Sequence, residues 1–590
     1  MKQYRYLLGW STRFLWQSSA KDVVGYCVFI AVQVISEVAQ LWLAALIVAE
    51  IGKIFLTQGS GEYVLLLAIL SIVLMTIDKI AWQMLGFFER RIYLYASANT
   101  YLMFNNKLAE LSISQHNDTE IRQMVDRIEY EGYMWKPINF SMELLYTLHA
   151  FIRFVVSSIV IFTVLPLVVL LLFIGVLPML YVQSKSGDAG WGIWGDIGDG
   201  SRVFWGITHI LRRREGIEEV KPQQSSAFLL NKAFATIRDY TARAIKVRNK
   251  YTKYEASASV FEMLLAGLSY LWLVWKAIGG GLSFERFIFT STLIWQTLSS
   301  IRLVTTSIGR AIMIVPFMND FTTFLSMKNS LPLRGEPIIP DGQGLTIELR
   351  NVNFSYPESD SPQINDVSFT INDGDHIALV GENGAGKTTL IRLLLRFYDP
   401  DAGSILVNGV DLRDIDLDWY YSKVGSLFQS FNHYPLSYRD NITLTDKVDT
   451  QRYKATLELS GADKVLDTIG SDARMLGQGF TKGADLSGGQ WQKVAIARNM
   501  YRNADLYILD EPTSAIDAIA EQQIFNKLFK EFSNKTLITV SHRFNTVRKA
   551  GTILVLENGK IVEVGSHEEL CEQKNSLYYT MFSAQAEGYK

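Results

Sequence analysis

Apolar residues fill the first half of the chain in stretches long enough to cross a lipid bilayer. They cover residues 23–49, 63–86, 138–182, 260–277 and 284–314. About 20 residues at a rise of 1.5 Å each fill the hydrocarbon core, so the third stretch is too long for a single crossing. We expect it to fold back at Thr163-Val164-Leu165-Pro166. The pattern therefore predicts six transmembrane helices.

The links between these stretches differ in charge. The short links around Gly59 and Gly279-Gly280-Gly281 hold few cations, whereas the two long links are rich in them. Lys and Arg accumulate on the cytoplasmic side of membrane proteins, which predicts that the long links and both termini are cytoplasmic, in an inner (plasma) membrane. Residues 1–22 lack a cleavage site and predict an interfacial helix. The cations of the long links are Arg90, Arg91, Lys107, Arg122, Arg127, Lys136, Arg212, Arg213, Arg214, Lys246, Arg248 and Lys250.

Both long links mix apolar and charged residues at helical spacing, so we expect the spans to continue as helices into the cytoplasm. Asn117-Asp118-Thr119-Glu120 has the form of a capping box that opens a short helix. Pro222 must interrupt the charged turn 218–222. Each of these two places is either a solvated helix end or a contact with the second half of the chain. Residues 186–196 are rich in glycine, which costs about 0.8 to 1 kcal/mol per residue in a helix, so we expect local loosening there.

Several ionisable residues fall at or near membrane depth. A charge at the centre of a span costs roughly 2.5 to 3.5 kcal/mol, so such residues should face a wet cavity or a partner. Glu37 either lines a translocation path or pairs with a cation such as Lys79 or Arg302, and we expect Arg302 to snorkel to the cytoplasmic side. The aromatic residues of the spans are expected to pack and to anchor at the interface instead of forming a substrate cage. The ionisable residues are Glu37, Asp78, Lys79, His149, Arg153, Glu262 and Arg302.

After residue 325 the long apolar stretches stop. Residues 326–344 contain the Pro and Gly residues typical of a linker. The patterns of residues 345–349 and 377–380 predict short strands. The prediction is a multidomain chain with an all-α six-helix transmembrane domain (1–325), a linker (326–344) and an α/β P-loop NTPase domain (345–590). The length of 590 residues and the apolar content of 48% agree with several domains, part of them in lipid.

Charge and cysteine content favour neither a nucleic-acid-binding protein nor a disulfide-stabilised domain. The net charge of −2 provides no general attraction to nucleic acid. Cys27 and Cys571 lie in very different contexts and cannot form a disulfide framework, so the catalytic part should be cytosolic.

A strand, a glycine-rich loop and a helix follow one another in the second half. The strand 377–380 runs into a G-x-x-x-x-G-K-T loop, and the helix covers 390–396. In this context glycine lets the backbone wrap around phosphates, Lys387 reaches the β and γ oxygens, and Thr388 can bind Mg²⁺. The loop predicts a P-loop NTPase that uses ATP and Mg²⁺. Its residues are Gly381, Glu382, Asn383, Gly384, Ala385, Gly386, Lys387, Thr388 and Thr389.

Two adjacent carboxylates end the apolar strand 506–509. Asp510 is placed to hold magnesium through water, and Glu511 to orient and deprotonate the attacking water.

The set of motifs resembles the nucleotide-binding domain of ABC transporters. Leu486-Ser487-Gly488-Gly489-Gln490 occurs together with Gln429, Asp517 and His542 in the family's order. Behind six predicted spans, the arrangement is similar to bacterial half-transporters of the ABC exporter type. From Tyr356 to Leu570 the resemblance rests on individual sequence motifs. Over the membrane half it rests only on the number and order of the predicted spans. It implies a helical subdomain within the α/β domain.

The resemblance assigns roles to further residues. It implies that Tyr356 stacks on adenine, although an ordinary strand tyrosine would look the same, that Gln429 senses Mg²⁺ and the water, and that His542 contacts the γ-phosphate. Ser487 and Gly489 open a helix near Gln490, a natural anion site. In the family this site binds the nucleotide of the other subunit; here it would be formed by Ser487, Gly488, Gly489 and Gln490. The resemblance also implies that Asp517 couples the two subunits across the same interface.

These features predict an ATP-hydrolysing transporter that exports a lipophilic, peptide or drug-like substrate by alternating access as a dimer. Its partners are a second half-transporter, membrane lipid and the transported substrate. Intact motifs favour a homodimer, and a heterodimer remains open. The alternatives are an ATP-gated channel or regulatory subunit, and an importer on the same fold. No peptidase-like extension precedes the first span, so cleavage of a leader peptide is not expected.

Overall fold

The structure is a computed structural model that divides into two compact units. The first comprises Met1–Leu111 and His116–Lys328, and the second Ser112–Gln115 and Asn329–Lys590. The described residues are 2–57, 61–130, 135–195, 198–331, 333–342, 344–357, 359, 361–477, 479–511, 526–541 and 547–587.

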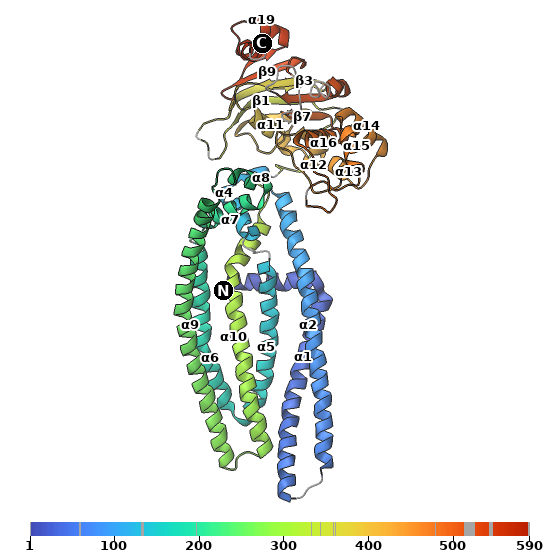
Figure 1. The fold of residues 1–590 in the computed structure, drawn as a ribbon. Helices are drawn as coiled ribbons and strands as arrows, with labels where there is room; N and C mark the ends of the chain where they lie inside the picture. Colours follow the sequence, from blue (N-terminus) through green and yellow to red (C-terminus); the bar gives the residue numbers. More distant parts are fainter. Residues whose placement is uncertain are drawn as a thin grey trace. The chain divides into compact units, whose positions relative to one another are not determined.

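The first unit is helical (Figure 1). Within the described residues, six helices are long and apolar enough to cross a membrane, which confirms the predicted number of spans. Helix α1 packs along α2, α5 along α10, and α6 along α9. The long helices are α1 (Lys2–Thr57), α2 (Glu62–Glu110), α5 (Lys136–Val164), α6 (Pro166–Gly195), α9 (Ser226–Ile278) and α10 (Phe284–Ser326), and the shorter ones α4 (Thr119–Tyr130), α7 (Gly198–Arg212) and α8 (Arg214–Val220). The short helix α3 (Ile113–Asn117) has residues in both units.

Several helices begin or end at the positions that the sequence predicts. Helix α5 ends at Val164 and α6 begins at Pro166, which is the predicted fold-back. Helix α4 begins at Thr119, because the Asp118 carboxylate accepts a hydrogen bond from the Ile121 N–H at 2.9 Å. Helix α8 ends at Val220, two residues before Pro222.

The glycine-rich segment differs from the expectation. Helix α6 continues through Gly195, so the backbone does not depart from the helix over 186–195. At Gly187, an added Cβ would lie 3.0 Å from the Met313 side chain on α10. The glycine therefore allows close helix packing, which compensates for its low helix propensity.

Ion pairs within the first unit also differ from the expectation. Glu37 pairs with a cation, as one of the two alternatives predicted, but the cation is Arg153 and not Lys79 or Arg302; its Nη2 lies 2.5 Å from Glu37 Oε1. The Arg302 Nη2 atom is 3.3 Å from Glu262 Oε1 on α9. The Lys79 ammonium lies over the Trp82 ring at 4.8 Å.

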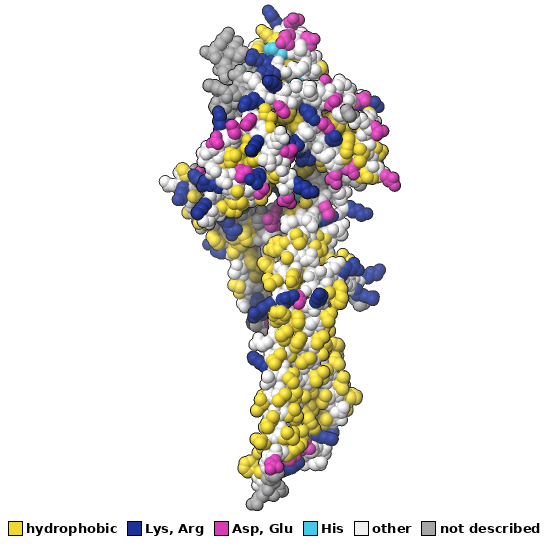
Figure 2. All heavy atoms as spheres, turned by 90° about the vertical axis from the view of Figure 1, so that its right-hand side faces the viewer, with side chains coloured by type: hydrophobic (Ala, Val, Ile, Leu, Met, Phe, Trp, Pro, Cys, Tyr) yellow, Lys and Arg dark blue, Asp and Glu magenta, His cyan; other side chains and the backbone are white. Residues whose placement is uncertain are grey.

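Hydrophobic side chains cover much of the outer surface of the long helices (Figure 2). On α2, Leu65, Leu66, Ile69 and Ile72 are more than half exposed. An apolar surface of this extent marks an interaction with lipid or protein, which agrees with a multi-pass membrane protein.

The second unit holds two sheets. An antiparallel sheet has the order β2-β1-β4-β5, and a six-stranded sheet has the order β10-β9-β3-β8-β7-β6, parallel except for the pairing of β10 with β9. The strands are β1 (Ile347–Phe354), β2 (Ile364–Ile371), β3 (His376–Val380), β4 (Ala402–Val407), β5 (Val410–Asp411), β6 (Val424–Leu427), β7 (Leu506–Asp510), β8 (Thr536–Val540), β9 (Thr552–Glu557) and β10 (Lys560–Gly565).

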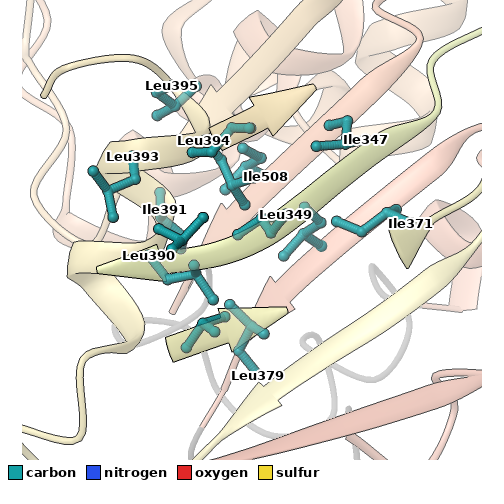
Figure 3. Packing of buried hydrophobic residues seen from close by; sticks show 14 of the residues in the cluster. Ile347, Leu349, Ile371, Leu379, Leu390, Ile391, Leu393, Leu394, Leu395 and Ile508 are labelled. Atoms are coloured by element: carbon teal, nitrogen blue, oxygen red, sulfur yellow. The ribbon is translucent and has the colours of Figure 1, made fainter. Parts of the chain in front are cut away.

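Helix α11 (Lys387–Leu394) follows β3 and packs into the core of this unit (Figure 3). Its residues Leu390, Ile391, Leu393 and Leu394 are buried against strands of both sheets. This packing fixes the loop between β3 and α11, because both of its ends belong to the core.

A separate apolar cluster around Tyr438, Leu457 and Trp491 forms the core of a group of helices. The α/β fold with a helical subdomain is thus confirmed. Helices of the second unit are α12 (Leu417–Lys423), α13 (Tyr438–Thr443), α14 (Thr450–Ser460), α15 (Asp463–Ile469), α16 (Gly488–Tyr501), α19 (His567–Glu572) and α20 (Leu577–Glu587), with a 3-10 turn η2 (Leu412–Asp414).

Candidate nucleotide site

The glycine-rich loop has a backbone that only glycine adopts easily. Gly386 is the N-cap of α11 with φ of 103°, and a Cβ there would lie 2.7 Å from the Gln363 carbonyl oxygen. At Gly381, a Cβ would collide with the Leu556 carbonyl oxygen. The loop therefore sits close to neighbouring backbone, and its amide groups are positioned at the start of α11, where anions bind.

Lys387 is buried at the first position of α11. Its Nζ donates hydrogen bonds to the carbonyl oxygens of Gly381 at 2.7 Å and Glu382 at 2.8 Å. Burial lowers the pKa of Lys387, while the Glu511 and Asp510 carboxylates counteract part of this shift. A bound polyphosphate would add negative charge beside this ammonium and favour its charged form.

Strand β7 positions the two carboxylates. Asp510 is its last residue and is buried, and Glu511 follows with φ of 48°. The Glu511 N–H donates to the Val540 carbonyl at the end of β8, 3.0 Å away. Gln429, two residues after β6, donates through Nε2 to Glu511 Oε2 at 2.8 Å. The ends of three parallel strands thus bring these polar groups together.

One cavity of about 250 Å³ joins the loop to these strand ends. Most predicted phosphate-site and metal-site residues line it, and so do Gln363 and Val540, which the sequence reasoning missed because no motif marks them. Hydroxyl, amide and carboxylate oxygens are the ligands that Mg²⁺ takes, so Thr388, Gln429 and Asp510 fit such an ion. The predicted lining residues are Asn383, Gly384, Ala385, Gly386, Lys387, Thr388, Thr389, Gln429, Asp510 and Glu511.

Tyr356 is not among the residues that line this cavity. Its ring packs edge-on against Phe354 and Tyr398, with centroids 5.1 and 5.3 Å away. Its hydroxyl accepts a hydrogen bond from Arg392 Nη1 at 2.9 Å. The stacking of Tyr356 on adenine stays a prediction.

The Ser487–Gln490 motif opens α16. This helix begins at Gly488, two residues before the predicted start, because Ser487 and Gln490 form a capping box. The Gln490 N–H donates to Ser487 Oγ at 3.4 Å, and the Ser487 N–H donates to Gln490 Oε1 at 2.9 Å. Among the described residues that line the 250 Å³ cavity, none belongs to this motif. Asp517 and His542 lie outside the described residues.

A larger cavity of about 610 Å³ lies within the first unit, between α2, α5, α6, α9 and α10. Glu143 on α5 and Arg310 on α10 line it, and their Oε1 and Nε atoms are 2.7 Å apart. The Tyr146 hydroxyl donates to the Glu89 carboxylate in the same cavity. The sequence reasoning missed these four residues, although Glu143 and Tyr146 lie at the i, i+3 spacing of one helix face.

Fold and site together define an ATPase of the P-loop class joined to a membrane domain. Residues 364–514 match the family model described as ABC transporter. The subtilin transport ATP-binding protein SpaT of Bacillus subtilis is 29% identical over 79% of this chain and 76% of its own length. The nisin transport ATP-binding protein NisT of Lactococcus lactis is 25% identical over 88% of each chain.

Among solved structures, a bacterial Atm1-family ABC exporter with ATP bound has the same fold. The TM-score is 0.81 at 20% identity, over 96% of this chain and 98% of that one. The second half of the chain thus carries an ABC transporter domain, and the matches support a half-transporter in which a membrane domain is joined to an ATP-hydrolysing domain.

Proposed function

We propose that two copies of this chain form an ATP-driven exporter that moves a lipophilic, peptide or drug-like compound out of the cytoplasm. The observation that carries the proposal is the single cavity in which Lys387, Gln429, Asp510 and Glu511 meet. A phosphate cradle, oxygen ligands for a metal and a carboxylate base are what ATP hydrolysis requires.

In this proposal the loop 381–389 binds the phosphates, with Lys387 on the β and γ oxygens. Thr388, Gln429 and Asp510 would hold Mg²⁺, which would supply charge neutralisation at the transferred phosphoryl group. Glu511 takes the proton of the attacking water. Its hydrogen bond from Gln429 Nε2 holds the carboxylate in position, so Gln429 links the metal ligands to the base. His542 is assigned to the γ-phosphate, and Tyr356 to the adenine.

A dimer is proposed because Ser487 and its neighbours lie outside the cavity that holds the phosphate loop, Gln429, Asp510 and Glu511. The N-terminus of α16 is an anion site, and it is available to the nucleotide of a second copy. Ser487, Gly488, Gly489 and Gln490 are assigned to that contact, with Asp517 beside it. A homodimer follows most simply, because every described hydrolysis motif of this chain is intact.

The membrane placement is part of the proposal. Residues 1–325 form the membrane domain, 326–344 the linker and 345–590 the ATPase domain. The cation-rich long links favour a cytoplasmic ATPase domain and cytoplasmic termini in an inner membrane. The 610 Å³ cavity is assigned to the cargo path, and relatives named for transport of subtilin and nisin support export.

Glu511→Gln tests the hydrolytic role in the purified dimer. We expect ATP binding to persist while phosphate release falls about 10² to 10⁴-fold, because the general base is lost. Glu531→Gln is the matched control, since Glu531 is exposed and lies outside the cavity. Unchanged hydrolysis by Glu511→Gln would refute the assignment.

A further inference from the structure

Five polar side chains from three membrane helices lie halfway along the apolar stretches of the first unit. Gln33 and Glu37 are one turn apart on α1, His149 and Arg153 are one turn apart on α5, and Gln296 lies on α10. The Glu37–Arg153 ion pair joins α1 to α5. Gln296 neighbours Glu37, and His149 neighbours Arg153. We call these five residues the mid-membrane polar cluster.

Every member of the cluster has a buried polar atom without a hydrogen-bond partner among the described residues. The atoms are Gln33 Oε1, Glu37 Oε2, His149 Nε2, Arg153 Nε, Gln296 Oε1 and Gln296 Nε2. Buried polar groups in native proteins are nearly always paired, and an unpaired group loses the free energy of its hydration. In the apolar part of a membrane protein such a concentration marks a functional site.

The chemistry of these atoms restricts the ligand. Glu37 and Arg153 form an ion pair and the Asp78 carboxylate lies near Glu37, so an isolated anion would gain no net attraction there and would lose its hydration. Because the Gln296 amide also interacts with the Glu37 carboxylate, the positions left for a ligand are the acceptors on Gln33 and Gln296 and the donor on Arg153. His149 Nε2 serves either role. A neutral group that donates and accepts side by side satisfies this set, and the peptide amide is such a group.

We propose that the mid-membrane polar cluster binds backbone amide groups of a peptide cargo. This inference rests on the proposed export function and narrows its cargo to peptides. The cavity that contains Glu143 and Arg310 shares helices α5 and α10 with the cluster. Arg153 follows Glu143 by ten residues on α5, which is about 15 Å at the helical rise. In this proposal, cargo passes from the cavity to the cluster along these shared helices.

Matched probes test the inference in the full-length dimer in lipid nanodiscs. The first probe is N-acetyl-tetraleucine amide, and the second is the depsipeptide in which ester oxygens replace its internal backbone N–H groups. ATP hydrolysis is measured against the concentration of each. We expect half-maximal stimulation by the amide at an about tenfold lower concentration, because the ester cannot donate to the unpaired acceptors.

Gln296→Leu removes two of the unpaired atoms without adding charge. Leucine is favourable in a membrane span, so we expect the thermal stability not to fall, whereas the preference for the amide is lost. Gln183→Leu is the control, because Gln183 has a buried, unpaired carbonyl oxygen on α6, a helix that contributes no member of the cluster. It should keep both the preference and the basal hydrolysis.

The outcomes separate this inference from the export proposal. Equal stimulation of the wild type by both probes, or a preference that Gln296→Leu leaves intact, overturns the role of the cluster and leaves ATP-driven export standing. Such a result would point to water or the second subunit as the partner of these atoms. Basal hydrolysis that neither probe stimulates overturns peptide cargo, whereas absent basal hydrolysis overturns the proposed function itself.

Discussion

At the residue scale, two glycines of the phosphate loop have similar backbone angles but different surroundings. Gly384 has φ of 85° and Gly386 has φ of 103°. A Cβ on Gly384 would meet nothing within 4 Å, whereas one on Gly386 would lie 2.7 Å from the Gln363 carbonyl oxygen. Alanine would strain the backbone at both positions, and only at Gly386 would it also collide with fixed backbone.

Gly386→Ala should therefore destabilise the ATPase domain more than Gly384→Ala does. Overpacking costs about 1 to 3 kcal/mol, so we expect a clearly lower temperature for the thermal transition of that domain, measured without nucleotide. Gly384→Ala serves as the control for the backbone strain alone. Equal shifts for the two variants would contradict the close approach of Gln363.

The residues of the phosphate site were predictable because short local sequence patterns identify them. Lys387 and Thr388 follow a strand and a glycine pattern, and Asp510 and Glu511 end an apolar strand. The partner of Glu37 was not predictable in this way. Which of Arg153, Lys79 and Arg302 it meets depends on how each helix is rotated about its axis, and packing between helices decides that.

At the element scale, two helices of the second unit begin with the same capping motif. Ser487 and Gln490 cap α16, and Ser566 and Glu569 cap α19, each pair forming a capping box. The serine oxygens accept at 3.4 and 3.3 Å, respectively. The two caps therefore contribute similarly to folding, whereas only the first is proposed to contact ATP.

Ser487→Ala and Ser566→Ala separate these two roles. Loss of either cap should cost about 1 kcal/mol of stability, which denaturation of each variant measures. Only Ser487→Ala should also reduce ATP hydrolysis by the dimer, because of the two serines only Ser487 is assigned to the nucleotide of the second copy. Similar hydrolysis by the two variants would leave Ser487 with a structural role alone.

Helix boundaries were predictable where a side chain or a proline sets them, as at Asp118 and Pro222. The continuation of α6 as a helix through residues 186–195 was not predictable. Glycine content predicts loosening of residues 186–195, but the sequence does not reveal that Gly187 meets Met313 on α10. Local propensity is a weak guide when a tertiary contact offsets it.

At the scale of the whole molecule, ATP must shift the protein between two states. Moving an equilibrium from 1:99 to 99:1 requires about 5.5 kcal/mol of differential binding. Two nucleotides, each bound between two copies of the chain, could provide this energy. That arrangement requires Lys387 of one copy and Ser487 of the other to act on the same ATP.

Mixed dimers test this requirement, because the same two substitutions can be placed in two ways. A Lys387→Ala protomer paired with a Ser487→Ala protomer has one site with both substitutions and one intact site. A protomer with both substitutions paired with wild type has one substitution in each site. Two different affinity tags isolate each mixed dimer, and hydrolysis is then measured.

We expect the first dimer to hydrolyse ATP and the second to be inactive, since mutations in one site act as a unit. If the second dimer were the active one, Lys387 and Ser487 would serve the same ATP within a single copy, and hydrolysis would not depend on a site shared between two subunits.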